Sequence, residues 1–198
     1  MRLKLNNIYL GIFIGVMLSA MVVTFYMFPY EEIESEEKTT IELIPSDDIN
    51  FSDWARAECG PHYYQCIYED LENDDSNYIW LPPGSKEEYR DVLFILDDPI
   101  ITLKQVTNIT VKVRACSPDG AKEETEKMKL IINNYYSPAI EPTGSWTNYS
   151  YTWENNPSTD ESWQAEDLVN LRAGLSGNNY NLREIKLTYL VVIVKGVI

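Results

Sequence analysis

The sequence predicts an all-β fold: a single antiparallel β-sandwich with one short helix, plus an N-terminal transmembrane helix. Three observations predict this fold class. Several short runs after residue 50 alternate polar and apolar residues, which is the two-residue period of a strand. Clusters of Pro, Gly, Asn and Asp separate these runs, and no long amphipathic pattern interrupts them. A long uncharged apolar stretch lies near the N-terminus.

The N-terminal apolar stretch, residues 8–28, matches a membrane span. As a helix it would be about 31 Å long, close to the thickness of the hydrocarbon layer. Arg2 and Lys4 precede it and glutamates follow it, so the positive-inside rule places the N-terminus in the cytoplasm. We expect a cytoplasmic tail at 1–7, contact with membrane lipid through 8–28, and a single-pass cell-membrane protein whose C-terminal domain lies outside. The alternatives are a cleaved signal peptide and a pilin-type leader.

Small residues recur on one face of the predicted transmembrane helix. Gly11, Gly15 and Ser19 are spaced four residues apart, and such a stripe lets two membrane helices approach closely. The stripe therefore indicates a homo-oligomer associated within the bilayer. The alternative is that these small residues face lipid.

The remainder of the chain divides into a linker and a domain. Residues 29–50 are acidic and weakly patterned, and we interpret them as a stalk that holds the domain away from the bilayer. Residues 51–198 form the β-sandwich domain. Its strands are expected at 62–69, 90–97, 106–116, 127–134, 150–154 and 183–196.

Periodicity also predicts which side chains enter the core. Ile109, Val111, Val113 and Ala115 share one face of the run 106–116, and Met128, Leu130 and Ile132 share one face of 127–134. The run 183–196 becomes apolar on both faces. The short helix is expected at 161–170, with Ser158 or Thr159 as its N-cap and with Trp163, Leu168 and Leu171 toward the core.

Part of the domain resembles a known fold family. In residues 146–175 a strand ends in a tryptophan and is followed by Asn-Pro-x-Thr, a second tryptophan, a short helix and a glycine-containing strand. The residues at these positions are Trp153, Asn156, Pro157, Thr159, Trp163, Leu168, Leu171 and Gly174. The pattern resembles a segment of jelly-roll domains in tailed-phage structural proteins and microbial surface proteins, and 64–79, 106–115 and 183–194 resemble other strands of such domains. The resemblance implies a jelly-roll-like sandwich whose role is mostly accessory.

Charge and composition argue against several functions. Acidic residues outnumber basic ones by 31 to 16, and the formal net charge of −15 gives a surface that repels nucleic acid. His62 is the one histidine, which argues against a multi-histidine zinc site and a serine triad. No phosphate-cradling glycine loop occurs in the sequence. We therefore expect neither catalytic residues nor a bound cofactor, and no enzyme activity.

The chain has 3 cysteines, all after the predicted membrane segment. Outside the cell thiols tend to pair, and the sequence alone allows any of the pairings. We favour Cys59–Cys66, which closes a small loop. Cys116 would then be buried or available for an intermolecular bond.

An acidic turn follows the first expected strand. Asp70, Asp74 and Asp75 offer hard oxygen ligands that suit Ca²⁺, and we take them as candidate calcium ligands although their spacing is not that of an EF-hand. The alternative is a solvated turn whose side chains bond their own backbone.

Aromatic residues gather before and within one expected strand. Trp146, Tyr149, Tyr151 and Trp153 lie close together, and the last three share one face. If exposed, they would form a platform that stacks on sugar rings; the alternative is that this face belongs to the core. Asn50, Asn108 and Asn148 each begin an Asn-x-Ser/Thr sequon and are candidate glycosylation sites, with Asn50 favoured because the other two lie in expected strands.

Together these features predict a membrane-anchored extracellular β-sandwich that acts as a non-catalytic binding or structural module at the cell surface. Its expected partner is a surface glycan or a protein. One alternative is a pilin-like or virion structural subunit, in which either the apolar helix or the C-terminal run 188–198 docks into a neighbour, by strand addition at an open edge. The other is a hydrolase-associated domain, whose carboxylate pair the sequence does not identify.

Overall fold

The structure is a computed structural model of the chain, and it describes residues 37–51, 53–57, 59–67, 75–82, 88–100, 103–118, 127–178 and 184–198. The predicted transmembrane helix at 8–28, with Gly11, Gly15 and Ser19, lies outside the described residues. Within the described ranges, no helix has the length and apolar character needed to cross a bilayer.

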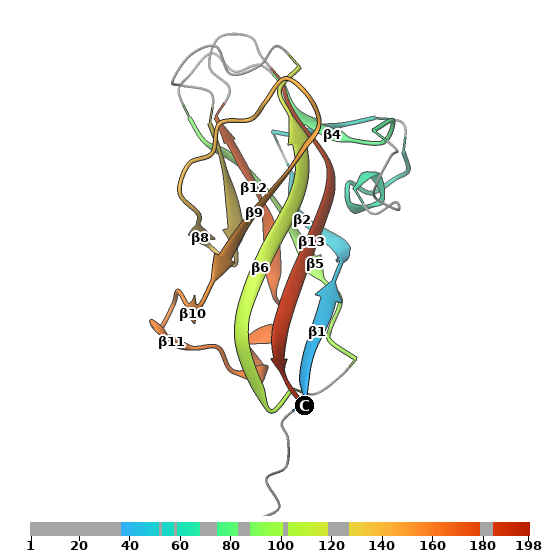
Figure 1. Ribbon diagram of the computed structural model, residues 1–198. Coiled ribbons are helices and arrows are strands. Elements are labelled where there is room, and N and C mark those ends of the chain that lie inside the picture. The colour runs from blue at the N-terminus through green and yellow to red at the C-terminus, as the bar shows by residue number, and fades with distance from the viewer. Residues whose placement is uncertain are drawn as a thin grey trace, which may run out of the picture. The chain divides into compact units, whose positions relative to one another are not determined.

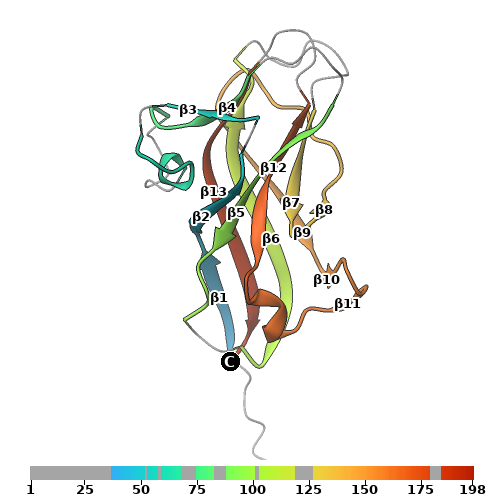
Figure 2. The ribbon, with the colours of Figure 1, turned by 180° about the vertical axis from the view of Figure 1, so that it is seen from behind.

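Two antiparallel sheets face each other and form a jelly-roll-like sandwich (Figures 1 and 2). The six-stranded sheet has the order β3-β4-β13-β6-β9, with β1 also paired to β13. Its strands are β1 (Lys38–Leu43), β3 (Ala55–Arg56), β4 (Ile79–Leu81), β6 (Gln105–Cys116), β9 (Thr147–Trp153) and β13 (Ile185–Val197).

The five-stranded sheet covers the other side of the core and has the order β2-β5-β12-β7-β8. Its strands are β2 (Pro45–Asn50), β5 (Arg90–Leu96), β7 (Lys127–Ile132), β8 (Tyr135–Tyr136) and β12 (Arg172–Asn178). A small hairpin of β10 (Asn155–Asn156) and β11 (Glu161–Ser162) follows β9. The all-β expectation is thereby confirmed.

The core lies between the sheets and follows the predicted alternation. The inward positions of β6 and β7 are completely buried: Ile109, Val111, Val113, Ala115, Met128, Leu130 and Ile132 are each 0% exposed. Because side chains of a strand alternate between its two faces, the residues between them point outward, and apart from Ile131 they are less buried.

Strand β13 is the centre of the six-stranded sheet. It pairs with β6 along one edge and with β4 and β1 along the other, as Figure 1 shows for β6, β13 and β1. Val192, for example, is paired with both Val111 and Leu43. Residues 192–197 are paired on both edges and have no free edge to donate, so the alternative in which the run 188–198 adds as a strand to a neighbour is wrong for this part of the run.

The stalk predicted at 29–50 is wrong for its second half. Residues 38–50 are β1 and β2, and the chain passes from the six-stranded to the five-stranded sheet between them. In β1, Ile41 and Leu43 turn toward the core while Lys38, Thr40 and Glu42 remain exposed. The polar outer residues hid this alternation within an acidic segment.

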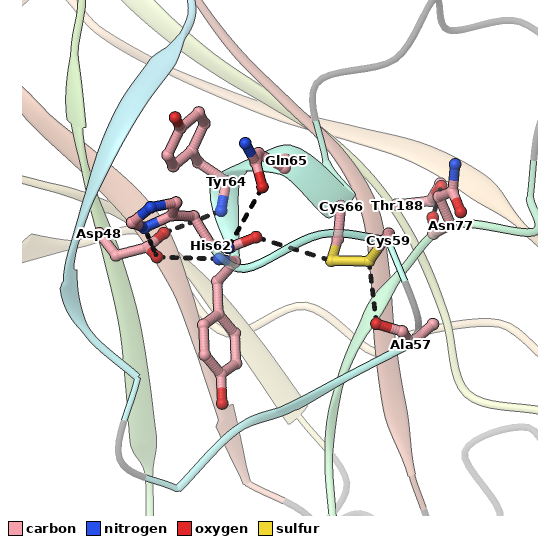
Figure 3. The surroundings of a disulfide bond; sticks show 10 residues. Asp48, Ala57, Cys59, His62, Tyr64, Gln65, Cys66, Asn77 and Thr188 are labelled. Carbon is pink, nitrogen blue, oxygen red and sulfur yellow. Dashed lines mark hydrogen bonds and ion pairs between the residues drawn. A yellow bond between two sulfur atoms is a disulfide. The ribbon is translucent and has the colours of Figure 1, made fainter.

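The strand predicted at 62–69 is also wrong for its described part, 62–67. Residues Tyr64–Cys66 form a short 3₁₀ helix, η1. Both carboxylate oxygens of Asp48 accept backbone N–H groups, from Tyr63 and Tyr64, at 2.8 Å each. These two N–H groups therefore find their acceptors at the start of η1 and not on a neighbouring strand. The Cys59–Cys66 disulfide closes the same loop (Figure 3).

The predicted helix at 161–170 is reduced to one 3₁₀ turn, η2 (Ala165–Leu168). The predicted caps Ser158 and Thr159 precede β11 instead. The Asp167 carboxylate accepts the backbone N–H of Gln164 at 2.8 Å and so holds the start of η2. The core prediction for this segment is confirmed, because Trp163, Leu168 and Leu171 are 1%, 2% and 1% exposed.

Candidate functional site

An aromatic cluster lies on the outer face of the six-stranded sheet, and we define it as Tyr78, Trp80 and Trp146. Strand β4 has three residues, and the first and last of them, Ile79 and Leu81, are completely buried. Alternation therefore turns Tyr78 and Trp80 away from the core. The register brings residues of three strands and the start of β9 to the same row of this face.

The row runs across the sheet. Trp80 of β4 is paired with Lys186 of β13, and Lys186 is paired with Cys116 of β6. Trp146 directly precedes β9, whose first residue Thr147 is paired with the neighbour of Cys116. The sheet thus places two tryptophans on either side of one lysine.

Tyr78 joins the two tryptophans. Its ring centroid lies 5.8 Å from that of Trp80 and 6.1 Å from that of Trp146, with interplanar angles of 61° and 55°. All three side chains are partly exposed. The Thr188 hydroxyl donates to the carbonyl oxygen of Asn77 at 2.6 Å, which fixes the backbone just before Tyr78 (Figure 3). The rings form a bent aromatic surface and not a flat one.

Lys186 lies against this cluster. Its ammonium nitrogen is 4.6 Å from the centroid of the Tyr78 ring, a cation–π contact, and 3.3 Å from a Glu184 carboxylate oxygen. Partial burial lowers the pKa of Lys186, but the hydrogen bond to Glu184 and the Tyr78 phenol outweigh it, so the net pKa is raised. The lysine therefore stays charged and holds the Tyr78 ring in place.

A second ion pair borders the cluster on β6. Arg114 donates two hydrogen bonds to Asp75, from Nε at 3.0 Å and from Nη2 at 3.2 Å. This bidentate pairing with Asp75 is the largest cause of the raised pKa of Arg114. Asp75 is one of the predicted calcium ligands, and here its oxygens bind a guanidinium.

The other predicted calcium ligands, Asp70 and Asp74, lie outside the described residues. In the part of the chain that the structure describes, no group of three or more His, Cys, Asp or Glu side chains gathers around one point. A calcium ion at this turn stays a prediction.

Cys116 lies in the same row but is buried, at 4% exposure. Burial raises the pKa of its thiol to about 11. Because the thiolate is the reactive form, a thiol with this pKa is a poor nucleophile near neutral pH. Cys116 therefore occupies its place in the row, paired with Lys186, as a small buried residue.

The structure separates the residues of the predicted platform. Tyr149, Tyr151 and Trp153 do share one face of β9, but that face packs against the core, and Trp153 is 8% exposed. The Trp153 carbonyl accepts the indole N–H of Trp163 at 3.0 Å. Of the predicted four, Trp146 alone joins the aromatic cluster. Sequence reasoning missed Tyr78 and Trp80, although their alternation with Ile79 and Leu81 was the signal that could have found them.

The disulfide prediction is confirmed. Cys59 and Cys66 are bonded with their Cα atoms 5.1 Å apart, and Cys116 is free. His62 lies in the same loop, with Nδ1 3.7 Å from Asp48 (Figure 3). The single histidine of the sequence therefore belongs to the loop that the disulfide closes.

The sequon asparagines have different surroundings. Asn50 and Asn148 are exposed, whereas Asn108 is half-buried and its side-chain oxygen has no hydrogen-bond partner in the described structure. Asn148 is paired with Arg114, so it lies beside the aromatic cluster. Glycosylation itself stays a prediction at all of them.

A second polar cluster lies on the outer face of the five-stranded sheet. Asp91 accepts hydrogen bonds from the Tyr136 phenol at 2.7 Å and from the Ser176 hydroxyl. The hydrogen bond to Asp91 is the main reason why the pKa of Tyr136 is raised to about 12. Lys129 lies 4.2 Å from the centroid of the Tyr89 ring. These groups satisfy one another, so we assign this cluster to stability.

Comparisons with known proteins add little to this picture. No family model matches the sequence, and no curated protein matches it either. Among solved structures, the chain is similar to CBM29_1, a family 29 carbohydrate-binding module from Piromyces equi, with a TM-score of 0.36 and 10% identity over 79% of this chain and 91% of that one.

Proposed function

We propose that this protein is a non-catalytic module that binds carbohydrate at the aromatic cluster. The observation that carries the proposal is the grouping of Tyr78, Trp80 and Trp146, all partly exposed, on one face of a rigid sheet. Partly exposed aromatic rings present an apolar face together with a polar tip. A sugar ring offers the complementary surface, with C–H groups on its face and hydroxyls at its rim.

The charges around the cluster favour a neutral sugar. Lys186 is paired with Glu184, and Arg114 is paired with Asp75, so neither cation is left to bind an anionic ligand. The overall charge of −15 also repels polyanions. The bent ring surface suits a single sugar chain or a terminal sugar better than a flat crystalline face.

We also propose that the module is anchored in the cell membrane through residues 8–28, with the sandwich outside. The support is the sequence: an uncharged apolar stretch, basic residues before it and acidic residues after it. In this arrangement the aromatic cluster would meet glycans of the envelope or of neighbouring cells.

A glycan array tests the carbohydrate proposal. The full chain is solubilised in a detergent without a sugar headgroup, because a glycosidic detergent would compete for the rings. We expect binding to a subset of neutral glycans, and we expect Trp80→Ala and Trp146→Ala each to weaken it about tenfold, which corresponds to about 1.4 kcal/mol. Tyr135→Ala is the matched control, since Tyr135 is a 37% exposed ring on the five-stranded sheet.

A further inference from the structure

A pocket lies at the end of the sandwich where β13 ends, and the aromatic cluster does not contribute to it. Its walls come from the β5–β6 connection, through Asp98, Pro99 and Leu103, and from η2, through Ala165, Glu166, Leu168 and Val169. Figure 2 shows η2 in orange at this end, close to the C-terminus. The cavity volume is about 360 Å³, at the lower end of the range for small-ligand pockets.

Hydrogen bonds anchor the chain next to both walls of the pocket. On one side, the backbone N–H of Asp97 donates to Ile44 at 2.9 Å and that of Lys104 donates to Val197 at 2.8 Å. On the other side, η2 follows the buried Trp163, whose indole N–H donates to the Trp153 carbonyl at 3.0 Å. These bonds hold the residues that flank the walls, and flanks that are already ordered lower the entropic cost of binding.

The base of the pocket is apolar, and large apolar side chains are exposed near it in the chain. Leu103 and Leu168 are each 2% exposed and form the base. Val169, which lines the pocket, is 58% exposed, and Ile100, which follows the lining residue Pro99 in the chain, is 100% exposed. A partner that covers these exposed apolar side chains would remove them from water.

The rim of the pocket is acidic. The Asp98 and Glu166 side chains are exposed, one from each wall, and among the described residues neither forms an ion pair. Asp97 and Asp167 add negative charge nearby, while exposed Lys104 is the basic residue next to Leu103 along the chain. The balance at the rim is negative, as it is for the whole chain.

From these observations we propose that the pocket is a docking site for a basic segment of a partner protein, namely a lysine or arginine flanked by apolar residues. The aliphatic stem of that side chain packs on Leu103 and Leu168, and its cationic head meets Asp98 and Glu166. The flanking apolar residues of the partner cover Ile100 and Val169. Charge complementarity across the rim selects this partner over an acidic one.

A capped tripeptide, acetyl-Leu-Lys-Leu-amide, is the probe that tests the proposal on the full chain in micelles. We expect saturable NMR shifts of the backbone amides of Leu103, Ala165 and Val169, with weak affinity at a Kd of about 1 mM. The same peptide with norleucine or with Nε-acetyl-lysine in place of lysine is expected to bind at least fivefold more weakly.

Two double variants complete the test. Asp98→Asn with Glu166→Gln is expected to reduce the affinity for the lysine peptide at least fivefold. Glu141→Gln with Glu154→Gln removes the same charge from exposed positions outside the pocket and is expected to change nothing. Equal binding of the norleucine peptide, or no shift in the pocket at about 10 mM peptide, would overturn the proposal. Trp80→Ala should leave this titration unchanged, so failure here and failure of sugar binding are distinguishable.

Discussion

At the scale of single residues, hydrogen bonds to carboxylates hold the outer faces of the sandwich. Tyr136 reaches Asp91 across the five-stranded sheet, from β8 at one edge to β5, and β7 and β12 lie between them. Ile131, which is paired with Tyr136, is 0% exposed although it points away from the main core. Tyr136 thus donates a hydrogen bond to Asp91 and lies on the same face of the sheet as the buried Ile131.

Replacing Tyr136 by phenylalanine is expected to lower the free energy of unfolding by about 1 kcal/mol at neutral pH, because the hydrogen bond to Asp91 is lost. Since the pKa of Tyr136 is raised to about 12 in the fold, this contribution is fully present below the ordinary tyrosine pKa of about 10. It is lost as the pH rises toward 12. Urea unfolding of both proteins between pH 8 and the alkaline limit of the assay checks this.

The result that would contradict this account is a stability difference that stays constant, or grows, as the pH approaches 12. A spectrophotometric titration of phenolate absorbance provides the control. The wild-type protein should show a delayed phenol ionisation that Tyr136→Phe lacks.

At the scale of elements, a glycine in β12 lets the central strands of the five-stranded sheet come close. A Cβ atom built on Gly174 would overlap the carbonyl oxygen of Val92 in β5. Backbone atoms of a paired strand cannot move aside in the way a flexible side chain can.

Gly174→Ala is therefore expected to lower the free energy of unfolding by about 3 kcal/mol, at the upper end for overpacking. Urea unfolding monitored by tryptophan fluorescence measures the change. Gly144→Ala, in an exposed turn, is the matched control and should change the stability by less than about 0.5 kcal/mol. Equal stability of the Gly174 variant and the wild type would show that β5 and β12 are not paired as described.

The disulfide loop is an element whose stability comes from a covalent closure. Cys59 and Cys66 are separated by 7 residues in the sequence. Removing such a short closure in Cys59→Ala/Cys66→Ala should cost about 2.5 kcal/mol of unfolding free energy in the chain-entropy view. Reduction of the wild type should produce a similar loss, whereas reductant should leave the double variant unchanged. A reductant effect on the double variant would implicate Cys116 in a second, intermolecular bond.

The same elements show what could be predicted from the sequence. Strands β6, β7 and β13 were predictable because burial on one or both faces leaves a plain alternation or a continuous apolar run. Segment 62–69 also alternates, yet its donors are taken by Asp48, which is distant in the sequence. Periodicity says nothing about such tertiary partners.

The candidate site was harder to predict for a related reason. Alternation correctly grouped Tyr149, Tyr151 and Trp153 on one face, but which face lies inside depends on the pairing of β9 with β6. Trp80 and Trp146 are far apart in the chain and meet through the register of β4, β13 and β6. Registers between distant strands are not written in any local pattern.

At the scale of the whole molecule, we propose a membrane span at residues 8–28 with the sandwich outside the cell. If residues 8–28 remain in the bilayer, the full chain should resist extraction by alkaline carbonate. Protease added to intact cells should then remove the sandwich, because the positive-inside rule places it outside. Release by carbonate, or protection of the sandwich in intact cells, would contradict this topology.

The central claim is that sugar binds at Tyr78, Trp80 and Trp146, and the indole N–H signals of the 5 tryptophans test it directly. The chain, labelled with ¹⁵N, is titrated with a neutral glycan selected on the array. The indoles of Trp80 and Trp146 should shift with the same dissociation constant. Those of Trp54 and Trp163, which donate to the carbonyls of Arg90 and Trp153 inside the fold, should stay in place. Binding of the glycan without movement of the Trp80 and Trp146 signals would contradict the account.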